Sequence, residues 1–94
     1  FVADSQEMRR DANVEAIDNL KLNLKDNGHD LAELPYVLQF NKRDLPGAMP
    51  SDEMTRELKF RDEPIFEAIA TRGDGVFDTL KSIIKLVLAD LRRR

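Results

Sequence analysis

The stretch PYVLQFNKRDLP, residues 35–46, decides how this chain folds. It opens with an apolar run, Tyr36–Phe40, that is rich in strand-forming residues. Such a run predicts a short strand covered on both faces, as strands in parallel sheets are. Polar residues follow at once in Asn41–Asp44, and Pro46 and Gly47 then interrupt regular secondary structure. The stretch therefore predicts a buried strand that ends in a polar loop.

Upstream of this stretch, the sequence predicts a strand and then a long amphipathic helix. Phe1–Ala3 is apolar and predicts the end of another strand. Ser5 can cap the helix and Gly28 can end it. Its apolar positions recur every three or four residues, at Val14, Ile17, Leu20 and Leu24.

Downstream, the pattern repeats twice. Residues 51–60, SDEMTRELKF, predict a shorter helix with Ser51 as its cap and Met54 and Leu58 facing inward. Residues 63–70, EPIFEAIA, contain a third candidate strand, and residues 71–75, TRGDG, turn the chain. The strongest helical stripe comes last, at Val76, Phe77, Leu80, Ile83, Ile84, Val87, Leu88 and Leu91.

Strands that alternate with helices predict right-handed crossovers and a parallel sheet. We therefore expect an α/β fold with three parallel strands and three helices, half of a doubly wound domain. We also expect the stripe of the last helix to pack on this sheet.

Length and composition exclude several classes of protein. Ninety-four residues allow one small domain. The net charge of -3 argues against general nucleic-acid binding, which needs a basic patch. The chain has no cysteine for a disulfide or a thiolate, and no apolar run of membrane-spanning length. These features predict a cytoplasmic protein with no stable membrane anchor.

In such folds, ligands bind beyond the carboxyl ends of the strands. Asp44 ends the polar loop and can accept two parallel hydrogen bonds from the N1-H and N2 amine of guanine, which adenine does not offer. The stem of Lys42 can lie along a purine face, and Asn41 can link neighbouring loops because its amide both donates and accepts. The backbone N-H of Ala70, in the loop after the third strand, can face the guanine O6. The alternative for residues 41–44 is a solvated turn.

Asp4 follows the first strand and allows two interpretations. It can contact a ligand, or it can cap the helix that follows. We expect the cap.

Two loops carry a resemblance to a known family. The NKRD of residues 41–44 is similar to the NKxD element of Ras-like small GTPases, and residues 67–73, EAIATRG, lie where that family has its second guanine loop. Ile69 and Thr71 stand where the family usually has Ser and Lys, and they complete the predicted base site of Asn41, Lys42, Asp44 and Ala70. Because their side chains differ from the family's, this loop is expected to act chiefly through the main chain of Ala70. Together, FVADSQ, PYVLQFNKRDLP and GVFDTLK resemble the bacterial mutual gliding-motility group of these GTPases.

The resemblance implies a role for the whole chain. Residues 1–94 would be the C-terminal part of a single P-loop GTPase domain, without the P-loop and switch segments of the N-terminal half. The complete domain would bind GTP or GDP and hydrolyse GTP with Mg²⁺, whose ligands lie outside this sequence, as do the catalytic residues. This part alone is therefore not expected to be active. The implied regulator is the roadblock-type Mgl B protein, and the implied role is a switch in polarity or gliding motility.

A second class of function stays open. The chain could be a doubly wound binding module, receiver-like or flavodoxin-like, without base specificity. A receiver would need an acidic cluster at its first strand ends, where only Asp4 is available.

Overall fold

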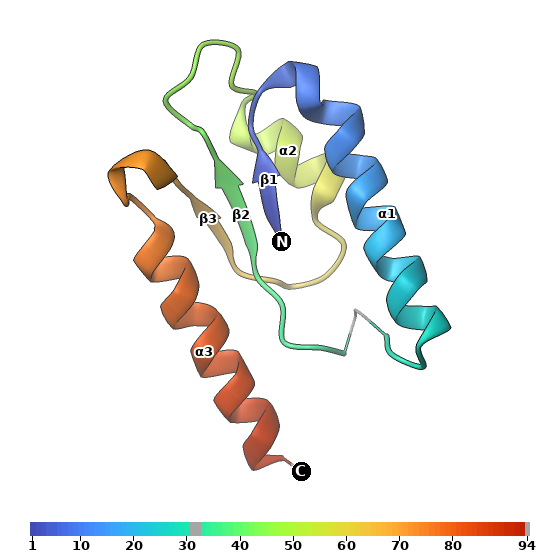
Figure 1. Ribbon diagram of the computed structural model, residues 1–94. Helices are drawn as coiled ribbons and strands as arrows, with labels where there is room; N and C mark the ends of the chain where they lie inside the picture. The colour runs from blue at the N-terminus through green and yellow to red at the C-terminus, as the bar shows by residue number, and fades with distance from the viewer. Residues whose placement is uncertain (31–32, 94) are drawn as a thin grey trace.

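The computed structural model describes residues 1–30 and 33–93 and contains one parallel sheet. Its strands are β1 (Val2–Asp4), β2 (Leu38–Asn41) and β3 (Ile65–Glu67), in the order β1-β2-β3 (Figure 1). Both neighbouring pairs run parallel. The predicted parallel α/β arrangement is therefore confirmed, with shorter strands than the apolar runs suggested.

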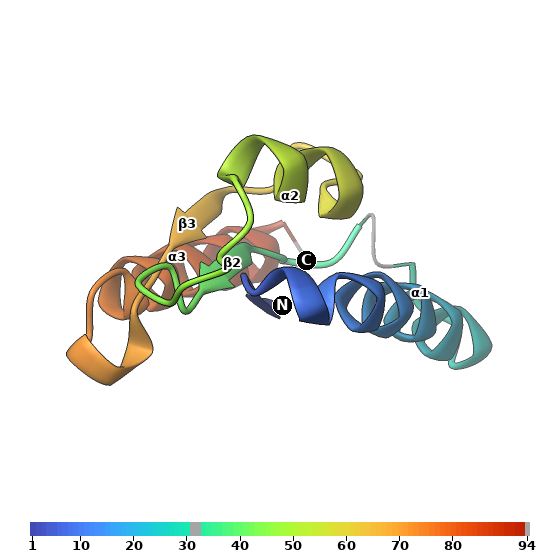
Figure 2. The ribbon, with the colours of Figure 1, turned by 90° about the horizontal axis from the view of Figure 1, so that it is seen from above.

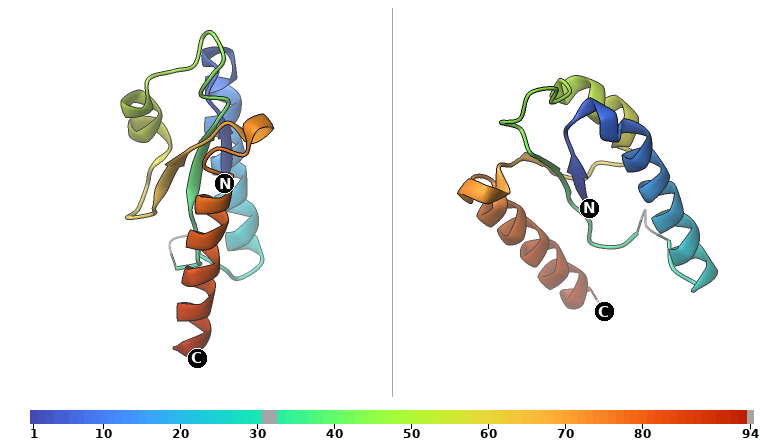
Figure 3. Two further views of the ribbon diagram at one scale, coloured as in Figure 1. Left: turned by 90° about the vertical axis from the view of Figure 1, so that its left-hand side faces the viewer. Right: turned by 45° about the horizontal axis from the view of Figure 1, so that its top comes forward.

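Three α-helices and two short 3-10 turns accompany the sheet. The helices are α1 (Arg10–Asp26), α2 (Ser51–Leu58) and α3 (Val76–Arg92), and the turns are η1 (Glu7–Arg9) and η2 (Ala70–Arg72). The crossovers between strands contain η1, α1 and α2, whereas η2 and α3 come after β3. Figure 2 shows α2 and α3 on opposite sides of the strands, and the right-hand view of Figure 3 shows α1 and α3 flanking them. The three predicted helices are thus confirmed.

The core lies between the sheet, α1 and α2. Leu38 and Phe40 are fully buried and point to this side of β2, because side chains alternate along a strand. Gln39 points to the other side, where its amide donates to the Thr79 hydroxyl on α3 at 2.8 Å. The buried cluster consists of Ala3, Ile17, Leu38, Phe40, Met49, Met54 and Leu58. Met54 and Leu58 therefore face inward, as the spacing of α2 predicts.

The apolar stripe of α3 does not pack into this core. No residue of α3 is buried, and Phe77, Ile84 and Leu91 are 66%, 48% and 55% exposed. The expectation that the stripe packs on the sheet is wrong for the described residues. On this side β2 meets α3 through the polar contact of Gln39 with Thr79, whereas Leu38 and Phe40 pack with α1 and α2 on the other side.

Neither Ser5 nor Ser51 caps a helix, contrary to the prediction. Ser5 lies before η1, is fully buried, and its hydroxyl has no hydrogen-bond partner within the described part of the chain. Ser51 is the first residue of α2, after Pro50, and its hydroxyl donates to Glu67.

The predicted end of α1 at Gly28 is confirmed. Gly28 has a φ of 81°, its N-H donates to Lys25 O at 3.0 Å, and the His29 N-H donates to Leu24 O at 2.8 Å. These two bonds form a Schellman motif, in which a glycine takes the left-handed conformation that other residues avoid.

Candidate functional site

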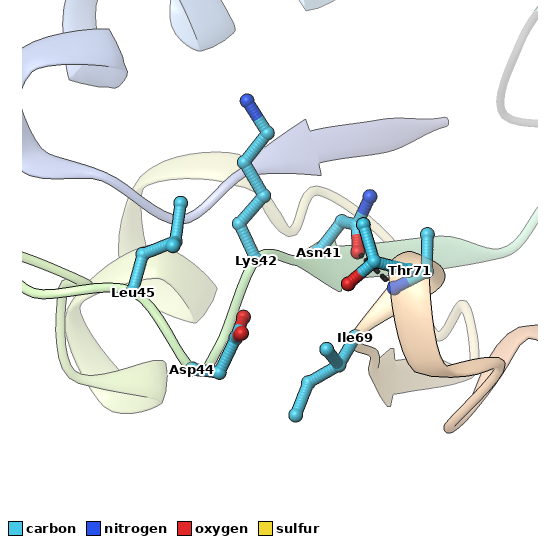
Figure 4. Close-up of a pocket in the computed structure, with 7 residues that line it drawn as sticks. Asn41, Lys42, Asp44, Leu45, Ile69 and Thr71 are labelled. Atoms are coloured by element: carbon cyan, nitrogen blue, oxygen red, sulfur yellow. Dashed lines mark hydrogen bonds between the residues drawn. The ribbon is translucent and has the colours of Figure 1, made fainter.

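The parallel register brings the polar ends of the strands to one edge of the sheet. Asp4 pairs with Asn41, and Phe40 pairs with Glu67, so β1, β2 and β3 end at similar heights. The loops after β2 and β3 leave this edge together (Figure 1). Between these two loops lies a pocket of about 140 Å³ lined by Asn41, Lys42, Asp44, Leu45, Ile69, Ala70 and Thr71 (Figure 4). All six residues predicted for the site therefore line one pocket.

A hydrogen bond between Ala70 and Asn41 links the two loops. The backbone N-H of Ala70 donates to the Asn41 side-chain oxygen at 2.9 Å. Asn41 therefore connects neighbouring loops as expected. The same bond changes the expected role of Ala70, because its N-H is already paired with Asn41 and a ligand carbonyl would have to share or replace that bond.

Asp44 supplies a carboxylate to an otherwise largely apolar lining. Its side chain is exposed and projects into the space between Lys42 and Ile69 (Figure 4). Leu45 and Ile69 contribute apolar walls. Leu45 was not predicted, although its position directly after the polar loop could have indicated it. A flat group with paired N-H donors at its edge matches this combination of carboxylate and apolar walls.

Lys42 is held in an unusual backbone conformation. Its φ of 61° is the one positive value found among non-glycine residues in the described ranges. Such a conformation costs about 1–2 kcal/mol for a residue with a β-carbon, and strained residues gather at functional sites. The stem of Lys42 extends past the end of β1, and its Nζ pairs with the Asp4 carboxylate at 3.0 Å (Figure 4).

Asp4 itself is neither a helix cap nor a residue of the pocket. One carboxylate oxygen accepts the Gln6 N-H at 3.0 Å, and the other accepts from Lys42. Partial burial raises the pKa of Asp4, but the Gln6 N-H, the Lys42 ammonium and the Arg9 charge together hold it below its ordinary value. The expected helix cap is therefore corrected, since Asp4 is instead the partner of a pocket residue.

Arg43 supports the polar loop from behind. Its guanidinium donates to Met49 O at 2.5 Å and pairs with Glu67 at 3.1 Å, and its backbone N-H donates to Ala68 O at 3.3 Å. The side chain therefore ties the loop to the end of β3 and does not line the pocket. Sequence reasoning gave Arg43 no role, since alternation within a loop does not predict which way a side chain points.

Gly75 closes the loop after β3. Its φ is 75°, and a β-carbon at this position would lie 2.1 Å from Glu67 O and 3.0 Å from the Ala68 Cα. The backbone of the loop thus passes directly against β3. Only glycine permits both the conformation and the close approach.

Residues 1–30 and 33–93 contain neither a metal-ligand cluster nor a membrane-spanning helix. No group of three or more His, Cys, Asp or Glu residues could hold a metal ion there. No helix in these ranges is both long and apolar enough to cross a membrane.

The chain is similar in sequence to known proteins. No family model matches it. It is 52% identical over 93 residues to the mutual gliding-motility protein MglA of Myxococcus xanthus. The resemblance to the mutual gliding-motility proteins is therefore confirmed. The aligned region covers 99% of this chain and 48% of MglA, so the chain spans about half the length of that relative.

A more distant similarity involves a larger protein. The chain is 40% identical over 76 residues to elongation factor 4 of Amoebophilus asiaticus, which is 78% of this chain and 12% of that factor.

Proposed function

We propose that this chain is the guanine-reading part of a small GTPase domain of the mutual gliding-motility type. Residues 1–94 would form the C-terminal part of one domain. In this proposal, Asp44 accepts the N1-H and N2 amine of guanine, and Lys42 lies along the base. Asn41 and Ala70 hold the two loops at the right separation, while Ile69 and Thr71 line the side of the pocket.

The observation that carries the proposal is the position of Asp44 in the linked pocket. A carboxylate between apolar walls pairs best with a base edge that carries two adjacent N-H donors. A base without that edge would leave the carboxylate unpaired. Adenine lacks a donor at N1. The pocket should therefore prefer guanine.

The size of the pocket limits what it can hold. Its volume of about 140 Å³ lies below the roughly 300–1,000 Å³ of sites that enclose a complete drug-sized ligand. It suits one ring system, with the sugar and phosphates outside. The phosphates and Mg²⁺ of GTP or GDP would then be held by other parts of the complete domain, and the 94-residue chain alone should not hydrolyse GTP.

The similarity to MglA supports the wider role. We propose that the complete protein hydrolyses GTP with Mg²⁺ and works as a cytoplasmic switch in bacterial polarity or gliding motility. A roadblock-type Mgl B protein would be its regulator. This part of the proposal rests on the 52% identity and on the NKRD of residues 41–44.

Exchanging Asp44 for Asn in the complete domain tests the proposal. The new amide would set a donor against the donors of guanine, so GTP affinity should fall by at least about 100-fold, as for a lost charged partner of about 3 kcal/mol. Xanthosine triphosphate should bind better, because its 2-carbonyl accepts from the amide. Competition binding with both nucleotides measures the change.

Asp52→Asn provides the matched control. It removes the same charge from an exposed position in the first turn of α2, outside the pocket. It should leave the nucleotide preference unchanged. A retained preference for GTP in Asp44→Asn would remove Asp44 from the base site. Equal binding of GTP and ATP by the parent domain would favour a doubly wound module without base specificity, the second class of function.

A further inference from the structure

We infer that Asp4 is a positioning residue for Lys42: anchored on α1 through Asn13, its carboxylate holds the lysine stem at the wall of the pocket. The inference rests on the proposed function for its link to guanine binding. Its structural part, the control of Lys42 by Asp4, can be measured without any ligand.

The first step is the anchoring of Asp4 on α1. Asn13 is buried, and its side chain bonds to both backbone groups of Asp4. The Asn13 amide donates to Asp4 O at 2.7 Å, and the Asp4 N-H donates to the Asn13 oxygen at 3.3 Å. A buried side-chain amide that bonds to both the N-H and the C=O of one residue fixes the backbone of that residue. These two bonds tie the end of β1 to α1.

The second step is the orientation of the Asp4 carboxylate. One of its oxygens accepts the Gln6 N-H at 3.0 Å, which limits rotation of the side chain. The other oxygen then faces Lys42 Nζ at 3.0 Å. The Asp4 side chain is 20% exposed and the Lys42 side chain 48% exposed. An exposed ion pair usually contributes little because both side chains must be ordered, but here the carboxylate is already fixed.

The third step concerns what a fixed Lys42 would do for binding. A free lysine stem samples many rotamers, and ordering such a side chain costs about 0.5–1.5 kcal/mol on binding. Its left-handed backbone directs the stem past the end of β1 towards Asp4. The pair thus orders the stem before any base arrives. Asp4 would raise affinity without touching the ligand.

The direct test is Asp4→Asn in the 94-residue chain, observed by nuclear magnetic resonance. The new side chain can still accept the Gln6 N-H but carries no charge for Lys42. The Cε and Nζ resonances of Lys42 should shift to the values of the other exposed lysines. Asp18→Asn, which removes an exposed charge from α1, is the matched control and should leave Lys42 unchanged. An unchanged Lys42 in Asp4→Asn would overturn the inference.

The functional test uses GTP binding by the complete domain. Asp4→Asn should weaken binding about 3- to 10-fold, the effect of one pre-ordered side chain. The difference from the parent should shrink at about 1 M salt, where exposed charges are screened, whereas damage to the fold would persist. Asp4→Glu should restore part of the affinity.

The outcomes separate the inference from the proposed function. If Lys42 is released but GTP affinity stays within about twofold of the parent, Asp4 does not act through Lys42 and the inference fails. If the parent domain does not prefer GTP over ATP, the proposed function fails. A Lys42 shift in Asp4→Asn would still support the positioning role in that case.

Discussion

Gly75 and Gly73 share a backbone conformation but differ in their surroundings. Both have a φ near 75–79°, yet a β-carbon at Gly73 meets no atom within 4 Å, whereas one at Gly75 lies 2.1 Å from Glu67 O. Gly73→Ala should therefore cost only the left-handed penalty, about 1–2 kcal/mol in the free energy of unfolding. Gly75→Ala adds a backbone clash and should cost at least about 3 kcal/mol. Urea denaturation of both variants measures the difference, and equal costs would show that β3 does not press against this loop.

Tyr36 gives the fold a dependence on high pH. Burial, followed by the nearby Glu63 charge, raises the pKa of the Tyr36 phenol to about 12, although Arg61 acts in the opposite direction. Since the folded chain holds the proton more tightly, this contribution to stability is complete below pH 10 and is lost as the pH rises from 10 towards 12. Tyr36→Phe should lack this loss.

The tyrosine absorbance can follow this titration directly. Tyr36 is the single tyrosine of the chain, which has no tryptophan, so the signal belongs to one group. A midpoint near 10 in the folded chain, or the same alkaline loss of stability in Tyr36→Phe, would contradict the effect.

At the scale of elements, α3 and β2 should respond very differently to truncation. Leu38 is fully buried in the core, whereas Ile84 is 48% exposed on α3. Leu38→Ala should lower the free energy of unfolding by about 2–5 kcal/mol, because it removes buried surface and leaves a cavity. Ile84→Ala should cost less than about 1 kcal/mol in this chain, since little is lost from a half-exposed site. Denaturant melts that ranked the two variants equally would place α3 in the core.

The sequence predicted the helices and strands better than it predicted which elements pack against one another. Periodicity showed which face of α3 is apolar, but it cannot show whether another element covers that face. Alternation in β2 would have helped, because Gln39 is the residue that faces α3. The parallel strands, the crossovers and the pocket loops could be predicted, because they depend on local patterns of apolar and polar residues.

The details of the site depended on contacts between distant residues. Asn41 was predicted to link loops because its side chain both donates and accepts, and the bond to Ala70 has this character. The pairing of Asp4 with Lys42 was missed. It requires the register of β1 on β2 and the left-handed backbone of Lys42, and neither is visible in the sequence.

For the whole molecule, the outer edge of β1 should govern association. The Phe1 nitrogen donates to Val37 O, just before β2, and the Ser5 nitrogen donates to Asn41 O at the end of β2, so the intervening Val2 N-H points away from the sheet. Val2 is also 59% exposed. Unpaired strand edges with apolar side chains attract further strands, so the 94-residue chain should self-associate as its concentration rises.

Val2→Pro tests this edge. Proline removes the outward N-H and leaves the bonds from Phe1 and Ser5 to β2 in place. Sedimentation velocity over a range of concentrations should show weaker association than for the parent, while Val2→Thr keeps the N-H and serves as the control. Equal association of both variants would assign it to another surface, such as the exposed apolar stripe of α3.

The bond between Asn41 and Ala70 joins residues that are 29 positions apart, and the β1 and β2 contacts span an even longer separation, with 36 positions between Phe1 and Val37. Contacts of this kind form only after long loops have closed, which makes them slow to appear during folding. We therefore expect the pocket to be completed late in folding, with its loop contacts absent from the transition state. A ligand bound in it would slow unfolding and leave the rate of folding almost unchanged.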